Sequence, residues 1–463
     1  MQTFRNNFPK TQNPSSFRSL NIIDPKFIPL IQIKNKIRYA IAAIDERLNK
    51  QLNAILHHPS FQKLEASWRG LEYLLFHTKS FNTVIIKVLN VSWNEVFKDI
   101  KRASDIESSQ LFDKIHNKEY DIAGGNPFNI LLGDYFAFSQ GITPADLATL
   151  RGLSQIAAAA FSVFIMSVDA KLFGVDNFSQ LKSFKGLSKF FKQLEFTSWE
   201  SFRKSEDSRF ISLLLPRVRL RPCYQDVELH NTGFLFGEQT FSTQDVLWGN
   251  PCYGYGVVIA RSFAHHNWFG DIRGLRDDRN SGGCCPNFFE INNQEPIKAQ
   301  FLTEIYITEI QEVYLAEAGF TSLSYNQQAK QLVFYSAQTV QRYKIYESSL
   351  VTANSAASSM LQYILCASRF AHYLKKIGRS KLGLFWRAQE CESFLERWLT
   401  RFVMTNDSDS DFLRAQYPLK GAKVRVKEVA GKPGHYQCII HLQPSFQLEQ
   451  LSASVVFFTE LTA

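Results

Sequence analysis

The sequence lacks an apolar run long enough to cross a membrane. Its longest mostly apolar stretch, Ile156 to Met166, is far shorter than the ~20 residues that a membrane helix needs. The first twenty residues contain no apolar segment of the kind found in secretory signals. The seven cysteines are odd in number and irregularly spaced, which favours reduced thiols over a disulfide framework. We therefore expect a cytoplasmic protein that does not insert into a membrane.

Motifs of the common enzyme classes are also absent. The sequence has no phosphate-binding loop, no G-x-S-x-G elbow, no H-E-x-x-H and no C-x-x-C. The adjacent pairs His265-His266 and Cys284-Cys285 are candidate soft-metal ligands, but their spacing does not match that of zinc sites. We expect no enzymatic activity and no cofactor, and a metal-dependent enzyme built on these four residues is a minor alternative.

The chain has enough apolar residues for more than one folded domain. Of its 463 residues, 45% are hydrophobic and 21% are charged, and 40 are phenylalanine, so we expect two or three globular domains with aromatic interiors. The net charge of +9 permits an acidic partner or a nucleic acid. The stretch from Arg369 to Arg401 holds eight Lys or Arg against three Glu. A basic nucleic-acid-binding protein is therefore the alternative function, although a solvated helix face explains the same charges.

Two helices are predicted near the N-terminus. Residues 1–33 are polar and proline-rich, which indicates an extended arm or, equally well, a disordered terminus. Apolar residues then recur every three or four positions, as on one face of a long helix: Ile37, Ile41, Ile44, Leu48, Leu52 and Ile55. After His57-His58, Pro59 can open a second helix. On this helix Leu64, Trp68, Leu71 and Leu75 share one face, which we expect to be buried in the core.

Strand and helix patterns alternate through the middle of the chain, which predicts an α/β class with a mixed core. We expect a helix from Pro144 to about Phe164, and strands at Thr83–Val91, Asn129–Phe138, Arg209–Leu220 with a break at Pro216, Phe301–Ile310 and Leu332–Ser336.

The last part of the chain changes from a helical period to a period of two. Residues 355–402 read as helix. The alternating apolar residues that follow predict a β-hairpin and a further strand: Val424 and Val426, then Tyr436, Cys438, Ile440 and Leu442, then Leu451, Val455 and Phe457. Val456 and Phe458 oppose the last pair, so the final strand is apolar on both faces and needs cover on both sides.

One long string and several short ones carry a family resemblance. The segment 57–75, HHPSFQKLEASWRGLEYLL, resembles the large sheath subunit of the bacterial type VI secretion system, the TssC/VipB family. Further strings resemble the same family in the same order: 171–174 (KLFG), 205–210 (SEDSRF), 247–250 (LWGN), 272–274 (IRG), 316–320 (AEAGF), 368–375 (SRFAHYLK) and 446–449 (FQLE). Together they cover roughly residues 35–463.

The resemblance implies a structural protein of a contractile sheath, related to phage tail sheaths. It implies an arm at 1–33, a sheath core at 34–344 and a C-terminal sheath domain at 345–463. The implied partners are a small sheath subunit of the TssB/VipA type, other copies of the chain, an inner tube of the Hcp type, a baseplate and a disassembly ATPase of the ClpV type. The machine is cytoplasmic and anchored to a membrane.

The resemblance also suggests roles for the patterns described above. The stripe Ile37–Ile55 would contact the small subunit, and the C-terminal strands would link neighbouring subunits by strand addition. Arg397 and Arg401, on the basic helical stretch, would contact the tube.

Overall fold

The computed structural model describes residues 28–122, 124–181, 186–224, 227–228, 234–240, 242, 244–276, 281–289, 302–380, 388–404, 416–428, 435–444 and 455–462. The chain forms two compact units. One comprises residues 1–61 and 223–245, and the other comprises residues 62–222 and 246–463. None of the described helices is both long enough and apolar enough to cross a membrane.

The first unit is built on one long helix, α1 (Ile28–Leu56), with the short strands β5 (Val227–Glu228) and β6 (Leu235–Phe236) paired beside each other. The helix begins nine residues before Ile37, so residues 28–33, which we predicted as part of the arm, are helical. Pro29 does not prevent this, because a proline in the first turn removes an N–H group that has no helical partner. The remainder of the predicted arm lies outside the described residues.

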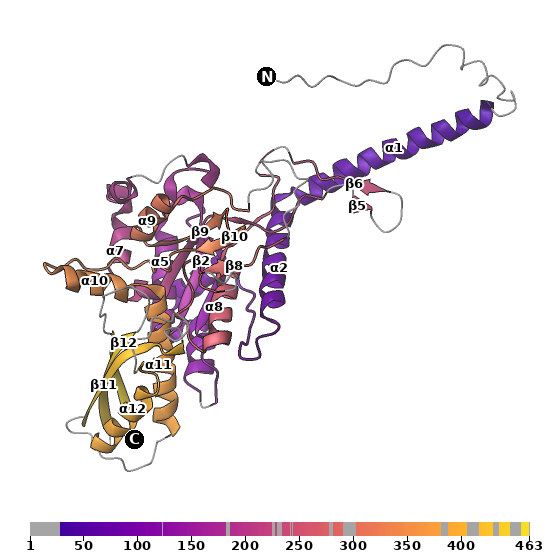
Figure 1. Cartoon of the computed structure of the whole chain (residues 1–463). Coiled ribbons are helices and arrows are strands. Elements are labelled where there is room, and N and C mark those ends of the chain that lie inside the picture. The colour runs from indigo at the N-terminus through magenta and orange to yellow at the C-terminus, as the bar shows by residue number, and fades with distance from the viewer. Residues whose placement is uncertain are drawn as a thin grey trace. The chain divides into compact units, whose positions relative to one another are not determined.

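The second unit contains a six-stranded mixed sheet (Figure 1). Its order is β1 (Ile130–Ala137), β2 (Val163–Val168), β3 (Ile211–Leu215), β9 (Phe320–Asn326), β10 (Gln331–Phe334) and β8 (Cys284–Cys285). The first four strands are parallel, and β10 and β8 continue the sheet in antiparallel pairs. The prediction of a mixed α/β core with a long N-terminal helix and a C-terminal β element is confirmed.

Helices cover both faces of this sheet because its central strands are apolar on both sides. On β2, Phe164 and Met166 belong to one apolar cluster, while Val163 and Ile165 belong to another. The first cluster includes residues of α3 (Trp93–Arg102), α5 (Pro144–Ala159), α7 (Thr197–Arg203) and α9 (Glu309–Glu317). The second includes residues of α2 (Pro59–Thr78), α8 (Cys252–His266) and α11 (Leu361–Ser380). The core therefore has three layers, helix, sheet and helix.

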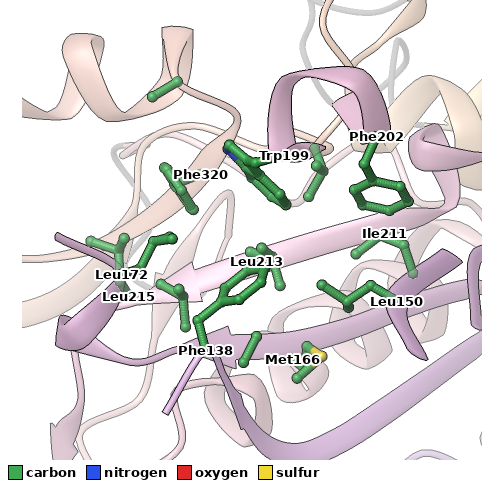
Figure 2. Close-up of a cluster of buried hydrophobic side chains, with 14 of the residues drawn as sticks. Phe138, Leu150, Met166, Leu172, Trp199, Phe202, Ile211, Leu213, Leu215 and Phe320 are labelled. Atoms are coloured by element: carbon green, nitrogen blue, oxygen red, sulfur yellow. The ribbon is translucent and has the colours of Figure 1, made fainter. Parts of the chain in front are cut away.

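Aromatic side chains fill the centre of the first cluster. Figure 2 shows Trp199 lying between Phe320 and Phe202. The Trp199 ring meets the edge of Phe138 at 5.4 Å between centroids and stacks on Phe320 at 6.3 Å. Phenylalanine side chains thus pack in the interior, as predicted from their abundance in the sequence.

The C-terminal part adds a second, smaller sheet. Its antiparallel order is β11 (Leu419–Glu428), β12 (His435–Pro444) and β13 (Val455–Thr462). These strands lie beside α11 and α12 (Ala388–Thr400), as Figure 1 shows, and α10 (Ser349–Ser358) precedes them in the chain. Within the described residues, helices occupy the predicted helical stretch, the hairpin is present, and a final strand runs over Val455–Thr462; residues 381–387 and 451–454 lie outside them.

Short elements complete the described chain: β4 (Val218–Arg219), β7 (Trp248–Gly249), α4 (Gln110–Phe112), α6 (Leu187–Phe190), a π-helix, η3 (Asp113–Tyr120), and 3-10 turns at Ile106–Ser108, Ala170–Phe173, Phe178–Gln180, Leu194–Phe196 and Asp207–Phe210. Strands β3 and β4 flank Pro216, so the predicted break there is confirmed.

Three predicted elements are wrong. Residues 83–91 form no strand, because β-branched residues need a neighbouring strand to pair with, and within the described chain none pairs with them. Ile85 in this segment is 73% exposed. Helix α5 ends at Ala159, not near Phe164, because β2 begins at Val163. Residues 302–308 form no regular strand, and α9 begins at Glu309.

Candidate assembly interfaces

The apolar stripe of α1 lies on the surface of its unit. Ile37, Ile41, Ile44, Leu48 and Ile55 are exposed, and Leu52 is half-buried. Leu30 and Ile33 are also exposed and extend the stripe toward the N-terminus with the same spacing of three and four. The eight residues now span more than three heptads, the length at which such a stripe indicates helix–helix packing. Sequence reasoning missed the first two because the nearby prolines suggested an arm.

The C-terminal end of α1 is held by a segment distant in the sequence. Asn53 donates from Nδ2 to the carbonyl of Gly237 at 3.3 Å and accepts from the Gln239 N–H at 2.8 Å. His57 Nε2 lies 3.2 Å from Oε1 of Glu238. His58 Nδ1 accepts from the N–H of Ser60 at 3.3 Å, at the start of α2. The two histidines therefore stabilise the junction between α1 and α2, and residues 237–239 hold the end of α1.

Helix α2 buries a different face from the one we predicted. Leu64, Trp68 and Leu75 are exposed, Trp68 by 65%, while Leu71 is half-buried. The buried residues are Gly70, Tyr73, Leu74 and Thr78. The prediction that Leu64, Trp68, Leu71 and Leu75 form a core face is thus wrong for the single chain.

Close packing against two other segments explains this rotation of α2. A Cβ atom on Gly70 would lie 2.3 Å from the ring of Tyr253 on α8, so only glycine allows this approach. Tyr73 stacks on Phe288 at 3.9 Å and donates a hydrogen bond to the carbonyl of Pro286 at 2.7 Å. Glu65 accepts from Arg221 at 2.8 Å on the same unit. A close contact at a glycine, an aromatic stack and an ion pair together determine the buried face.

The apolar side chains of the C-terminal hairpin belong to the core of its own domain. Val424, Val426, Cys438, Ile440 and Leu442 are buried in one cluster with Leu395 and Leu399 of α12. These five side chains are already covered within the domain, so the predicted inter-subunit link through these strands stays a prediction that would have to rest on their backbone. Leu451 lies outside the described residues, and for Tyr436, Val455, Val456, Phe457 and Phe458 the structure describes the backbone alone.

The two edges of the C-terminal sheet differ. At the β11 edge, Glu392 of α12 accepts a hydrogen bond from the backbone N–H of Val426 at 2.9 Å. β13 pairs with β12 from Val455 to Thr462, and no described strand lies on its other side. An edge of this kind can accept a strand from another chain.

The basic stretch of α11 and α12 does not form one continuous charged face. Arg369 stacks on the rings of Phe263 and Tyr373, at 4.3 and 4.8 Å from their centroids. Lys375 and Arg379 both pair with the carboxylate of Asp121, at 2.9 and 3.1 Å. Three of the eight basic side chains thus contact other groups of the same chain. Because they are already engaged there, the stretch gives less support to a nucleic-acid-binding surface. Arg397 and Arg401 are exposed.

The candidate metal ligands have other contacts. His266 Nε2 lies 3.7 Å from Oδ2 of Asp271, and Cys285 Sγ lies 3.3 Å from the hydroxyl of Tyr73. Burial raises the pKa of Cys285 to about 12, so its thiol stays protonated. Within the described ranges, no three His, Cys, Asp or Glu side chains converge as a metal site. The arrangement gives the metal-enzyme alternative no support.

His372 links α11 to the end of α5. Its Nε2–H donates to the carbonyl of Ala160 at 2.9 Å, so Nδ1 accepts from the Asn129 amide at 3.2 Å. Burial, with Arg369 and Lys375 nearby, lowers its pKa from 6.5 to about 4. The neutral imidazole is therefore the form that fits the fold.

Lowering the pH should consequently reduce the stability of the second unit through His372. The stability that the folded chain has with neutral His372 is fully present above about pH 6.5, the pKa of histidine in the unfolded chain. This stability is lost as the pH falls toward about 4, because the unfolded chain then binds a proton that the folded chain does not. We expect a loss of about 1–3 kcal/mol in the free energy of unfolding over this window. Denaturant unfolding at about pH 7.5 and about pH 5 measures it. His372→Gln, which cannot titrate, should show a flatter dependence; equal slopes for both proteins would contradict this assignment.

Two sequence comparisons with known proteins agree on one family. The tail sheath N-terminal domain of the EvpB/VC_A0108 family matches residues 38–341, and its tail sheath gpW/gp25-like domain matches residues 351–461. The chain is 34% identical over 430 residues to the type VI secretion system sheath protein TssC1 of Pseudomonas aeruginosa, covering 92% of this chain and 86% of that protein. A cryo-EM structure of the anti-feeding prophage baseplate overlaps 81% of this chain and 83% of its own, at 10% identity and a TM-score of 0.37. The chain therefore belongs to the TssC/VipB family of type VI secretion sheath large subunits.

Proposed function

We propose that this chain pairs with a small sheath subunit through α1 and polymerises helically around an inner tube, as a structural protein without catalytic activity. The observation that carries the proposal is the exposed apolar stripe from Leu30 to Ile55. Eight apolar residues in heptad-like spacing are costly to leave in water, since each buried Leu or Ile side chain is worth about 1.5–3 kcal/mol. A second amphipathic helix is the partner that such a stripe fits.

Links between neighbouring subunits would use the open edge of β13. Backbone hydrogen bonds from a strand of another copy would give affinity there without requiring the side chains that the domain has already buried. Arg397 and Arg401 would face the inner tube. Contraction would then be a rearrangement between two packed arrangements of the subunits, with the strand links as hinges. Attachment to a baseplate, disassembly by an ATPase and a cytoplasmic location complete the proposal, and family membership supports them.

Charge substitution on the stripe tests the pairing. Ile41→Glu with Ile44→Glu places two carboxylates in the proposed apolar contact, so we expect at least a hundredfold loss of affinity for the co-expressed small subunit, about 3 kcal/mol or more. Co-purification from cells followed by titration of the purified chains measures this.

The matched control is Tyr39→Glu, because Tyr39 is an exposed aromatic residue on the same helix but off the stripe. It should leave pairing within about threefold of the parent. Normal pairing by the double variant, or a good yield of monomeric parent chain at high concentration, would contradict the proposal.

A further inference from the structure

Two cysteines of the C-terminal domain lie side by side in its core. Cys391 on α12 and Cys438 on β12 are both buried in one apolar cluster, and their side chains interact electrostatically. The backbone places them there independently of the thiols. Glu392, next in sequence to Cys391, accepts from the N–H of Val426, and Val426 stands directly opposite Cys438 in the β11–β12 register. The start of α12 is thus fixed to β11, next to the point where Cys438 stands on the central strand.

The surroundings make the two thiols unequal. The electrostatic interaction with the Cys438 thiol lowers the pKa of Cys391, whereas that same interaction and burial raise the pKa of Cys438. Cys391 is the fourth residue of α12 and retains slight exposure, while Cys438 is completely covered. Cys391 is therefore the thiol that a small oxidant reaches first, and Cys438 is the neighbouring thiol that can then attack the oxidised sulfur.

We propose that Cys391 and Cys438 form an intrachain disulfide when the protein meets a peroxide, and that the bond fastens α12 to the central strand of the C-terminal sheet. The Cys391 thiolate attacks one peroxide oxygen, the O–O bond breaks, and the departing hydroxide takes a proton and leaves as water. Cys438 then attacks the resulting sulfenic sulfur, gives its proton to the departing hydroxide and completes the S–S bond. Two thiols are oxidised and one peroxide is reduced to two waters.

Thiol counting and peptide mapping test the proposal on the full-length chain in its assembled form. After treatment with hydrogen peroxide, the denatured chain should present five alkylatable thiols in place of seven. A peptide containing residue 391 should be found linked to one containing residue 438, and dithiothreitol should release it. Hydrogen exchange of α12 should slow by about tenfold in the oxidised chain, because its opening is then tied to that of the sheet.

Cys366 supplies the matched control, since it is buried in the same cluster on α11. Cys391→Ala and Cys438→Ala should each abolish the cross-link, while Cys366→Ala should leave it unchanged. Seven free thiols after oxidation, a bond that maps to other cysteines, or Cys391 oxidised without a link to Cys438 would overturn the proposal. So would unchanged exchange of α12 in the cross-linked chain.

Discussion

Replacing Trp199 with alanine should lower the free energy of unfolding of the second unit, which contains the six-stranded sheet, by about 3–5 kcal/mol. The side chain is 0% exposed and lies among Phe138, Phe202 and Phe320, so its removal leaves a cavity between α7 and the sheet. In the described part of the chain its indole Nε1 makes no hydrogen bond, so the loss comes from packing alone. A folded domain is stable by only about 5–15 kcal/mol, which makes this a large fraction. Chemical denaturation of the purified complex measures the change.

Trp68→Ala is the matched control for this experiment. It removes the same side chain from a position that is 65% exposed, so we expect a loss below about 1 kcal/mol in the stability of the unit. If Trp68 contributes to a subunit contact, its loss should appear in the yield of assembled sheath and not in unfolding. Equal destabilisation by the two substitutions would contradict the burial that the structure assigns to α2.

Removing residues 451–463 should abolish long tubes while leaving the heterodimer intact. The deletion takes away β13 and with it the open edge at which we propose that a neighbouring strand adds. The hairpin of β11 and β12 should remain folded, because its apolar face packs on α12 through Val424, Cys438 and Ile440. The pairing that we propose uses α1, which lies in a different part of the chain from this sheet. Co-purification followed by negative-stain microscopy distinguishes these effects.

The outcomes of this truncation separate three roles for the strand. Soluble heterodimer without tubes supports the inter-subunit link. Ordinary sheaths from the truncated chain would show that β13 only covers its own domain. Loss of the heterodimer would show that β13 is required for the subunit to fold, which the buried hairpin face argues against.

Local patterns determined much of this protein from the sequence alone. The spacing of Ile37 to Ile55 predicted a long helix, because a repeat of three and four residues places side chains on one face regardless of what lies opposite. The alternation around Val424 and Ile440 predicted the hairpin for the same reason at a period of two. The strings from residue 57 onward indicated the family, which the comparisons confirm.

Only the tertiary structure decided which surfaces are covered. Burial depends on segments far away in the chain, so no local pattern showed that Gly70 and Tyr73, and not Trp68, would meet α8 and Phe288. The same holds for the basic stretch, where Lys375 and Arg379 both pair with Asp121, which lies more than 250 residues away in the sequence. It holds for residues 83–91 too, because a strand forms only where another strand lies beside it.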